Sequence, residues 1–181
     1  LVDDVLQFEQ RVAKADRRGL EQAAEEVRRL LNASGKQGPA HDSRLVRALE
    51  RREREIQDRI HRLRDIESAK RLMIDAGAAA DRQEHERAIE IYDEIFAKFS
   101  SVLEPAELAD LRARREDAQF RRDGRALFNQ VQSAGDVGRK RSLLKDFLAK
   151  YANPVYRSTA AVEQAQAQLL AVEAEALRLE R

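Results

Sequence analysis

A segment of twelve residues occurs twice in this chain, 65 residues apart. Residues 16–27 align with residues 81–92, and the same Asp, Arg, Glu, Ala and Glu stand at equivalent positions in both copies. A fainter third copy starts at Asp136, where Leu144 and Phe147 take the places of apolar residues in the second copy. Repetition of one helical unit is typical of stacked arrays, because each unit buries its apolar face against its neighbours. The repeat therefore predicts a helical array, and such arrays mostly bind other proteins.

The composition favours helices throughout. Ala, Leu, Glu and Arg dominate, and all four are good helix formers, whereas few β-branched runs exist to support a sheet. Charged residues make up 37% of the chain, above the ~25% of ordinary globular domains. Only three Pro and seven Gly interrupt the 181 residues. We expect an all-α fold of stacked antiparallel helical hairpins, in a single domain over residues 1–181.

Apolar residues at helical spacing divide this domain into sub-units. The sub-units cover residues 1–33, 43–100 and 105–181, and residues 32–42, with two Gly and a Pro, form the clearest loop. One long helix is predicted over about 43–79, and another long helix ends the chain. Asp16 suits the cap of the second helix, and Pro105 suits the first turn of a later one.

The spacing also predicts which side chains face inward. In the second helix these are Ala23, Ala24, Val27, Leu30 and Leu31. At the end of the long helix they are Leu72, Met73 and Ile74. In the last helix they are Val162, Ala165, Leu169, Val172, Ala176 and Leu179. Arg52 and Glu53 interrupt the stripe of the long helix. Eight of the nine aromatic residues lie between Tyr92 and Tyr156, so the second half should hold the better-packed core.

Residues 86–95, Glu-Arg-Ala-Ile-Glu-Ile-Tyr-Asp-Glu-Ile, resemble the second helix of a tetratricopeptide repeat. Residues 23–27 resemble the same helix, and residues 143–156 are similar to the variant found in bacterial periplasmic and lipoprotein-anchored members of that family. A small residue such as Ala88 lets two helices approach, and the aromatic Tyr92 one turn later fills the gap. The resemblance implies a protein-binding scaffold with a groove lined by the first helices of each pair.

The sequence contains no motif that indicates catalysis, a metal or a cofactor. His41, His61 and His85 are the only histidines, and only Asp58 and His61 stand at the i, i+3 spacing of a carboxylate-bridged site. We therefore expect solvated histidines rather than metal ligands. The Gly-containing turn at 135–138 lacks the strand and the Lys-Ser/Thr of a phosphate-binding loop. There is no nucleophile elbow, and the absence of Cys excludes disulfides and thiol chemistry. The chain is predicted not to be an enzyme.

Two arginine-rich stretches are the candidates for binding a partner. Residues 44–71 hold ten basic and six acidic residues. The second stretch offers Arg112, Arg115, Arg122 and Arg125, of which Arg115 and Arg122 share a helix face. An acidic peptide or a nucleic acid would suit such arginines, although few aromatic residues interleave them for base stacking. The alternative is an ordinary charged surface with intrahelical ion pairs.

The balance of charge bears on the class of partner. The net charge is +1, which argues against a dedicated nucleic-acid or membrane-surface binder, and no apolar run approaches the ~20 residues of a membrane span. No signal peptide is visible, and the first residue is Leu1, so we expect a fragment of a larger bacterial-type protein, cytoplasmic or periplasmic.

We predict a non-catalytic segment for protein–protein interaction or scaffolding, with another protein or peptide as its partner. One alternative is a coiled-coil type structural segment that forms a homodimer through its long helices, because their apolar stripes resemble heptad seams. The other alternative is binding of an acidic partner or a nucleic acid through the arginine-rich faces, of which nucleic acid is the less expected.

Overall fold

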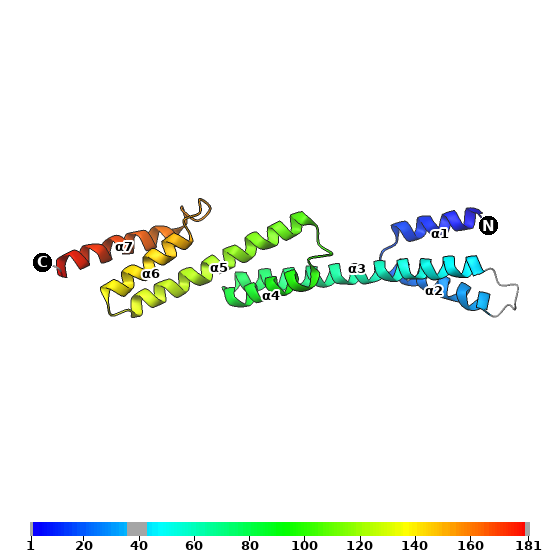
Figure 1. Cartoon of the computed structure of the whole chain (residues 1–181), viewed down its shortest axis with the longest axis horizontal. Helices are drawn as coiled ribbons and strands as arrows, with labels where there is room; N and C mark the ends of the chain where they lie inside the picture. The colour runs from blue at the N-terminus through cyan, green and yellow to red at the C-terminus, as the bar shows by residue number, and fades with distance from the viewer. Residues whose placement is uncertain (1, 36–42, 180–181) are drawn as a thin grey trace. The chain divides into compact units, whose positions relative to one another are not determined.

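The computed structural model describes residues 2–35 and 43–179, which fold into helices joined by short turns (Figure 1). Within these residues there are seven α-helices and no strand, so the predicted all-α class is confirmed. The helices are α1 (Val2–Lys14), α2 (Arg17–Gly35), α3 (Ser43–Asp81), α4 (His85–Phe99), α5 (Pro105–Ser133), α6 (Val137–Lys150) and α7 (Ala160–Leu179).

Local signals in the sequence mark several helix starts. Asp16 accepts a hydrogen bond from the Gly19 N–H at 2.8 Å, and so caps α2 as predicted. Pro105 is the first residue of α5, where its missing N–H costs nothing. Asp136 caps α6 by accepting a bond from the Arg139 N–H at 2.8 Å. The long helix α3 runs for 39 residues, two further than the predicted end at residue 79.

The chain divides into two compact units. Unit 1 consists of Leu1–Leu72 with Lys98–Leu103, and unit 2 consists of Met73–Ala97 with Glu104–Arg181. The division passes through α3 and through the end of α4, whereas the sequence pattern places its sub-unit boundaries in loops.

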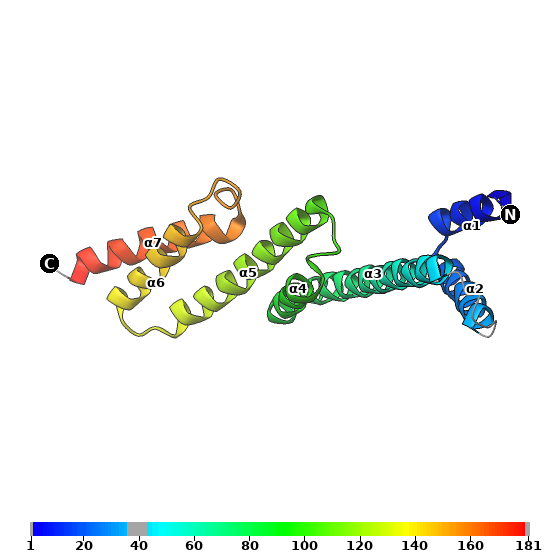
Figure 2. The same ribbon diagram turned by 45° about the vertical axis from the view of Figure 1, so that its right-hand side comes forward.

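Unit 1 has an aliphatic core where α1 and α2 pack on the first part of α3 (Figure 2). Its buried residues are Val12, Leu20, Ala23, Ala24, Val27, Ile56 and Ile60. Leu30 is 51% exposed, so the prediction that it faces inward is wrong. Leu30 lies near the end of α2, and the described residues that pack on this core include Leu31 but not Leu30.

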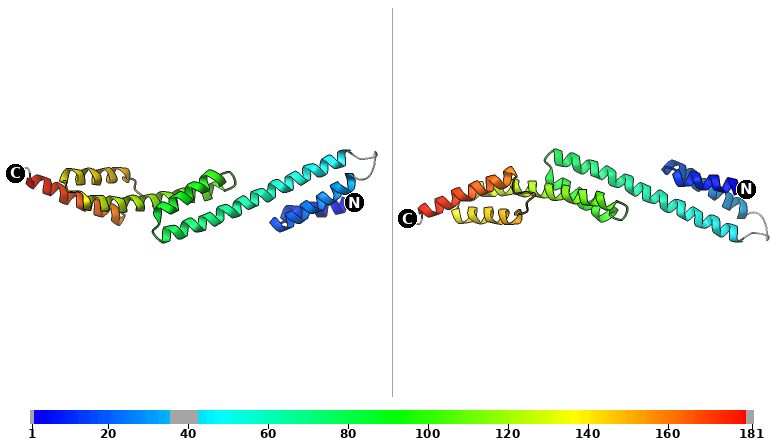
Figure 3. Two further views of the ribbon diagram at one scale, coloured as in Figure 1. Left: turned by 90° about the horizontal axis from the view of Figure 1, so that it is seen from below. Right: turned by 90° about the horizontal axis from the view of Figure 1, so that it is seen from above.

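Unit 2 has an aromatic core built by α5, α6 and α7, which pack one against the next (Figure 3). The Phe120 ring lies 4.9 Å from that of Tyr151, edge to face, and 4.5 Å from that of Tyr156, stacked. The Phe147 ring lies 5.9 Å from Phe120. Aromatic pairs in these geometries stabilise a core beyond the area that they bury. The aromatic residues of the second half therefore form a core together, as their grouping in the sequence suggested.

The other parts of unit 2 follow the predicted pattern except at two positions. Ala88, Tyr92 and Ile95 of α4 are buried, as predicted from the second copy of the repeat. Ile74 and Leu179 were expected to face inward, yet they are 71% and 73% exposed. In both helices the apolar pattern continues past the segment that packs against other helices, so no described side chain covers these two residues.

Candidate functional site

The turn between α3 and α4 borders a hollowed surface of unit 2. The Gln83 N–H donates to the Ala80 carbonyl and the Glu84 N–H donates to the Ala79 carbonyl, both at 2.9 Å. This pair of bonds is a Schellman motif, which ends a helix with one residue in the left-handed conformation. Gln83 is that residue, with φ of 63°. The motif reverses the chain sharply and places His85 at the start of α4 beside α5.

Three adjoining hollows meet at His85. They have volumes of about 430, 400 and 450 Å³, and His85 lines all three. The end of α3 and the following turn form one wall, through Ala80, Asp81 and Gln83, and α5 forms the other. In the first hollow, the aromatic rings of Phe120 and Phe128 provide an apolar floor. We call this surface the His85 hollow.

His85 is partly buried rather than solvated as the sequence suggested. Its Nδ1 atom is buried and has no hydrogen-bond partner among the described residues. Burial lowers the pKa of His85, and the positive charges of Arg121 and Arg125 lower it further, although Asp117 acts in the opposite direction. The imidazole is therefore neutral near pH 7. A neutral imidazole has one nitrogen that donates a hydrogen bond and one that accepts.

Four arginines of α5 line the His85 hollow, and they differ in how they are paired. Arg114 forms an ion pair with Asp110 at 2.8 Å, one turn earlier on the same helix. Arg121 forms an ion pair with Asp117 at 2.8 Å, one turn earlier on the same helix. Arg122 bonds to Asp123 at 2.9 Å. Arg125 is exposed, lines two of the hollows and has no side-chain partner in the described part of the chain. The hollow thus contains a guanidinium that is available to an anionic group.

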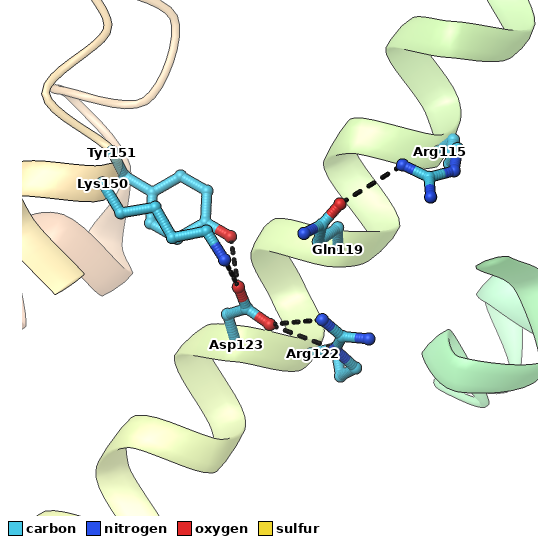
Figure 4. A network of polar contacts seen from close by, with 6 residues as sticks. All are labelled: Arg115, Gln119, Arg122, Asp123, Lys150 and Tyr151. Atoms are coloured by element: carbon cyan, nitrogen blue, oxygen red, sulfur yellow. Dashed lines mark hydrogen bonds and ion pairs between the residues drawn. The ribbon is translucent and has the colours of Figure 1, made fainter.

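Asp123 fixes α6 to α5 behind this surface (Figure 4). Its carboxylate accepts hydrogen bonds from the Tyr151 hydroxyl at 2.6 Å, from Lys150 and from Arg122. Burial alone would raise the pKa of Asp123, but the three donors outweigh burial and lower it. Burial, together with the bond to Asp123, raises the pKa of Tyr151. The network is a structural joint that also orients Arg122.

The structure brings two of the four predicted binding residues together. Arg122 and Arg125 both line the third hollow. Arg115 instead binds Asp93 of α4, with Nε at 2.5 Å and Nη2 at 3.2 Å from the two carboxylate oxygens, and it contacts Gln119 (Figure 4). Arg112 is exposed on α5 and lines none of the three hollows. Arg115 is therefore a link between helices, and Arg125 is the open guanidinium.

Three of the arginines in residues 44–71, Arg52, Arg59 and Arg64, join α3 to the other helices of unit 1. Arg59 donates to the Val12 and Ala13 carbonyls at 2.6 and 2.9 Å, which caps the end of α1. Further pairs join α3 to the two preceding helices: Arg52 with Glu9, Arg64 with Glu21, Glu53 with Arg28 and Glu67 with Arg17. Arg52 and Glu53 interrupt the apolar stripe because they meet partners on α1 and α2.

The remaining candidates offer little chemistry. Over residues 2–35 and 43–179, no three side chains of His, Cys, Asp or Glu lie close enough to hold a metal ion. Asp58 and His61 are exposed, and His41 lies outside the described residues. The side chains that line the His85 hollow include no Ser, Thr or Cys, and Tyr92 is the residue among them that carries a hydroxyl.

Comparison with known proteins adds no assignment: no family model, curated protein or solved structure matches the chain. None of the helices in the described segments is long and apolar enough to cross a membrane. Sequence reasoning named Arg122 and Arg125 but missed His85 and Asp123. The sequence feature that could have pointed to His85 is its position directly after the turn at the start of the second repeat copy.

Proposed function

We propose that this chain is a non-catalytic protein-interaction segment, and that its unit 2 binds an acidic stretch of a partner protein or peptide in the His85 hollow. The observation that carries the proposal is Arg125, an exposed guanidinium that lines the hollow with His85 and has no carboxylate partner among the described residues. A carboxylate would accept a charge-assisted hydrogen bond from Arg125, and the neighbouring imidazole could donate a second.

The shape and composition of the hollow support a peptide rather than a small ion. Phe120 and Phe128 offer apolar contact next to Arg121 and Arg125. A ligand that alternates apolar and acidic side chains would fill both kinds of surface. Hollows of about 400 Å³ are within the size range of sites that hold organic ligands, which start at roughly 300 Å³.

We further propose that the helices stack as tetratricopeptide-like hairpins. Ala88 is fully buried and Tyr92, one turn later, is 2% exposed, which is the pair that brings two helices close in such hairpins. In the first copy Ala23 is buried as well. The successive packing of α5, α6 and α7 is consistent with a stack.

Fluorescence anisotropy with a labelled peptide of alternating Glu and Leu tests this proposal. The full chain should bind the peptide at low ionic strength and more weakly as salt is added, since the contacts are charged. Arg125→Gln should weaken binding by about tenfold or more, because a hydrogen bond to a charged group is worth ~1.5–3 kcal/mol. Binding should strengthen as the pH falls through the lowered pKa of His85, because the imidazole then gains a positive charge.

Arg112→Gln is the matched control, since Arg112 is exposed on the same helix but lies outside the hollow. It should leave peptide affinity unchanged. Equal losses of peptide affinity in the two variants would mean that the charged surface of α5 binds the peptide non-specifically, rather than at the His85 hollow. A labelled RNA or DNA oligonucleotide that binds more tightly than the acidic peptide would contradict the proposal and favour the nucleic-acid alternative.

A further inference from the structure

Helix α7 is apolar on two opposite sides. Val162, Ala165 and Val172 are buried on the side that packs against the aromatic core. The opposite side carries Ala167, Leu170, Ala174 and Leu177 at intervals of three, four and three residues, and all four are exposed. Leu170 is 69% exposed and Leu177 is 62% exposed. Isolated exposed leucines need no explanation, but a continuous apolar stripe indicates an interface.

Opposite charges stand at the two ends of this stripe. Glu163 lies four residues before Ala167, and Arg178 lies four residues after Ala174, so both fall on the same side of α7. Both side chains are exposed, and neither has a hydrogen-bond or ion-pair partner within the segments that the structure describes. We call the six residues from Glu163 to Arg178 on this side the outer face of α7: Glu163, Ala167, Leu170, Ala174, Leu177 and Arg178.

We propose that the outer face of α7 pairs with the outer face of α7 in a second copy of this chain, with the two helices antiparallel. A two-fold axis between positions 170 and 171 would place Glu163 opposite Arg178 at both ends of the pair. The same axis would place Ala167 opposite Ala174, where two small residues let the helix backbones approach closely. Leu170 would lie beside the axis and contact its counterpart.

The charges select this arrangement over its alternatives. Parallel pairing would place Glu163 against Glu163 and Arg178 against Arg178, and like charges that face each other repel. Antiparallel pairing also places the negative end of each helix dipole beside the positive end of its neighbour. A face that is complementary to itself under a two-fold axis fits a second copy of the chain better than it fits an unrelated surface.

The size of the outer face sets the expected strength of pairing. It contributes six residues from each copy, whereas stable interfaces use roughly 20–30 residues from each side. The dimer should therefore be weak and reversible, with a mass that rises toward twice the monomer value only as the chain is concentrated. This surface is separate from the His85 hollow, so the inference does not depend on the proposed peptide binding.

Sedimentation equilibrium of the full chain over a concentration series, up to about 100 µM or above, tests for association. Leu170→Glu should abolish the rise in mass while the helical content measured by circular dichroism stays the same, because Leu170 is exposed. Leu30→Glu is the matched control, since Leu30 is an exposed leucine of unit 1. It should leave the rise unchanged.

Charge reversal tests the direction of pairing. Glu163→Arg should weaken association by about tenfold, because it creates two repulsive contacts in each dimer. The double variant Glu163→Arg with Arg178→Glu should restore association to the original strength. Failure of the double variant to restore association would contradict the antiparallel arrangement.

The absence of native Cys allows a direct test by cross-linking. Under mild oxidation, Leu170→Cys should form a disulfide-linked dimer, because the two residues meet at the axis. Glu163→Cys should cross-link with Arg178→Cys in a mixture but not with itself. A chain that stays monomeric at the highest concentration, or a Glu163→Cys variant that cross-links with itself, would overturn the proposal. In either case Arg125→Gln still reports on peptide binding separately.

Discussion

The two units of this chain bury different kinds of side chain and hold their helices with different polar contacts. Unit 1 buries Val, Leu, Ile and Ala, and exposed ion pairs from α3 to α1 and α2 surround that core. Unit 2 buries Phe and Tyr rings in mutual contact, and a half-buried carboxylate, Asp123, joins two of its helices. Exposed ion pairs contribute ~0–1 kcal/mol each, while aromatic contacts and partly buried charged hydrogen bonds contribute more.

The comparison shows that arginines of the same chain have different roles in the two units. In unit 1, Arg52, Arg59 and Arg64 of α3 contact α1 and α2, so these three side chains stabilise the unit and are not available as a binding surface. In unit 2, Arg125 lies beside a hollow and has no carboxylate partner in the described structure. All three tyrosines, Tyr92, Tyr151 and Tyr156, belong to unit 2, so tyrosine fluorescence reports on that unit alone.

Phe120→Ala should have the largest effect on stability. Phe120 is 5% exposed and touches the rings of Phe147, Tyr151 and Tyr156, and truncating a buried aromatic residue costs ~3–5 kcal/mol. Thermal unfolding followed by tyrosine fluorescence should show a much lower Tm for unit 2. Amide hydrogen exchange in α2 should be unaffected. Loss of protection in both units would mean that they unfold as one.

Asp123→Asn should destabilise unit 2 by ~1–3 kcal/mol at pH 7, because it removes a charged acceptor from three donors. The pKa of Asp123 is lowered in the folded chain, so its contribution is present above the unfolded pKa of about 4 and is lost as the pH falls through the folded value. Urea unfolding at several pH values should therefore show a difference between the two proteins that shrinks below pH 4.

If the difference between the natural chain and Asp123→Asn were constant from pH 7 to pH 3, the ionised carboxylate would not be the stabilising form. Tyr151→Phe provides the matched control. It removes one donor but leaves Lys150 and Arg122 in place, and should cost less than Asp123→Asn.

Arg59→Met should destabilise unit 1 by about 1–2 kcal/mol, since it keeps most of the apolar stem but removes two hydrogen bonds to the end of α1. Hydrogen exchange in α1 should accelerate while tyrosine fluorescence of unit 2 stays unchanged. Arg62→Met is the control, because the Arg62 side chain is exposed and has no partner among the described residues. Equal effects of both changes would indicate loss of general charge rather than loss of the cap.

Gln83→Gly should have the smallest effect, a gain of up to about 1 kcal/mol in unit 2. A left-handed residue with a side chain costs roughly 1–2 kcal/mol, and Gly relieves this cost but loses ~0.5–1 kcal/mol through the entropy of the unfolded chain. Gln83→Ala keeps the strain and should give no gain. A gain in Tm for Ala equal to that for Gly would rule out relief of backbone strain as the cause.

Features set by neighbouring residues could be predicted from the sequence, and features set by distant helices could not. Asp16 and Pro105 mark helix starts because capping depends on residues one turn away. Leu30, Ile74 and Leu179 were misplaced because burial at the end of a stripe depends on whether another helix reaches it. The pairing of Arg115 with Asp93 and the meeting of Arg125 with His85 join residues of different helices. No spacing rule predicts such contacts.

The attachment of α1 has a consequence for how the chain opens in its native state. This helix has 13 residues, and isolated helices shorter than ~12–15 residues are marginal in water. Of its described side chains, Val12 is buried, and the guanidiniums of Arg52 and Arg59 hold it from outside. Such a helix behaves as a foldon of low opening free energy, which detaches and rebinds while the rest of the protein stays folded. Among the described helices, α1 should therefore be an early site of cleavage by a protease.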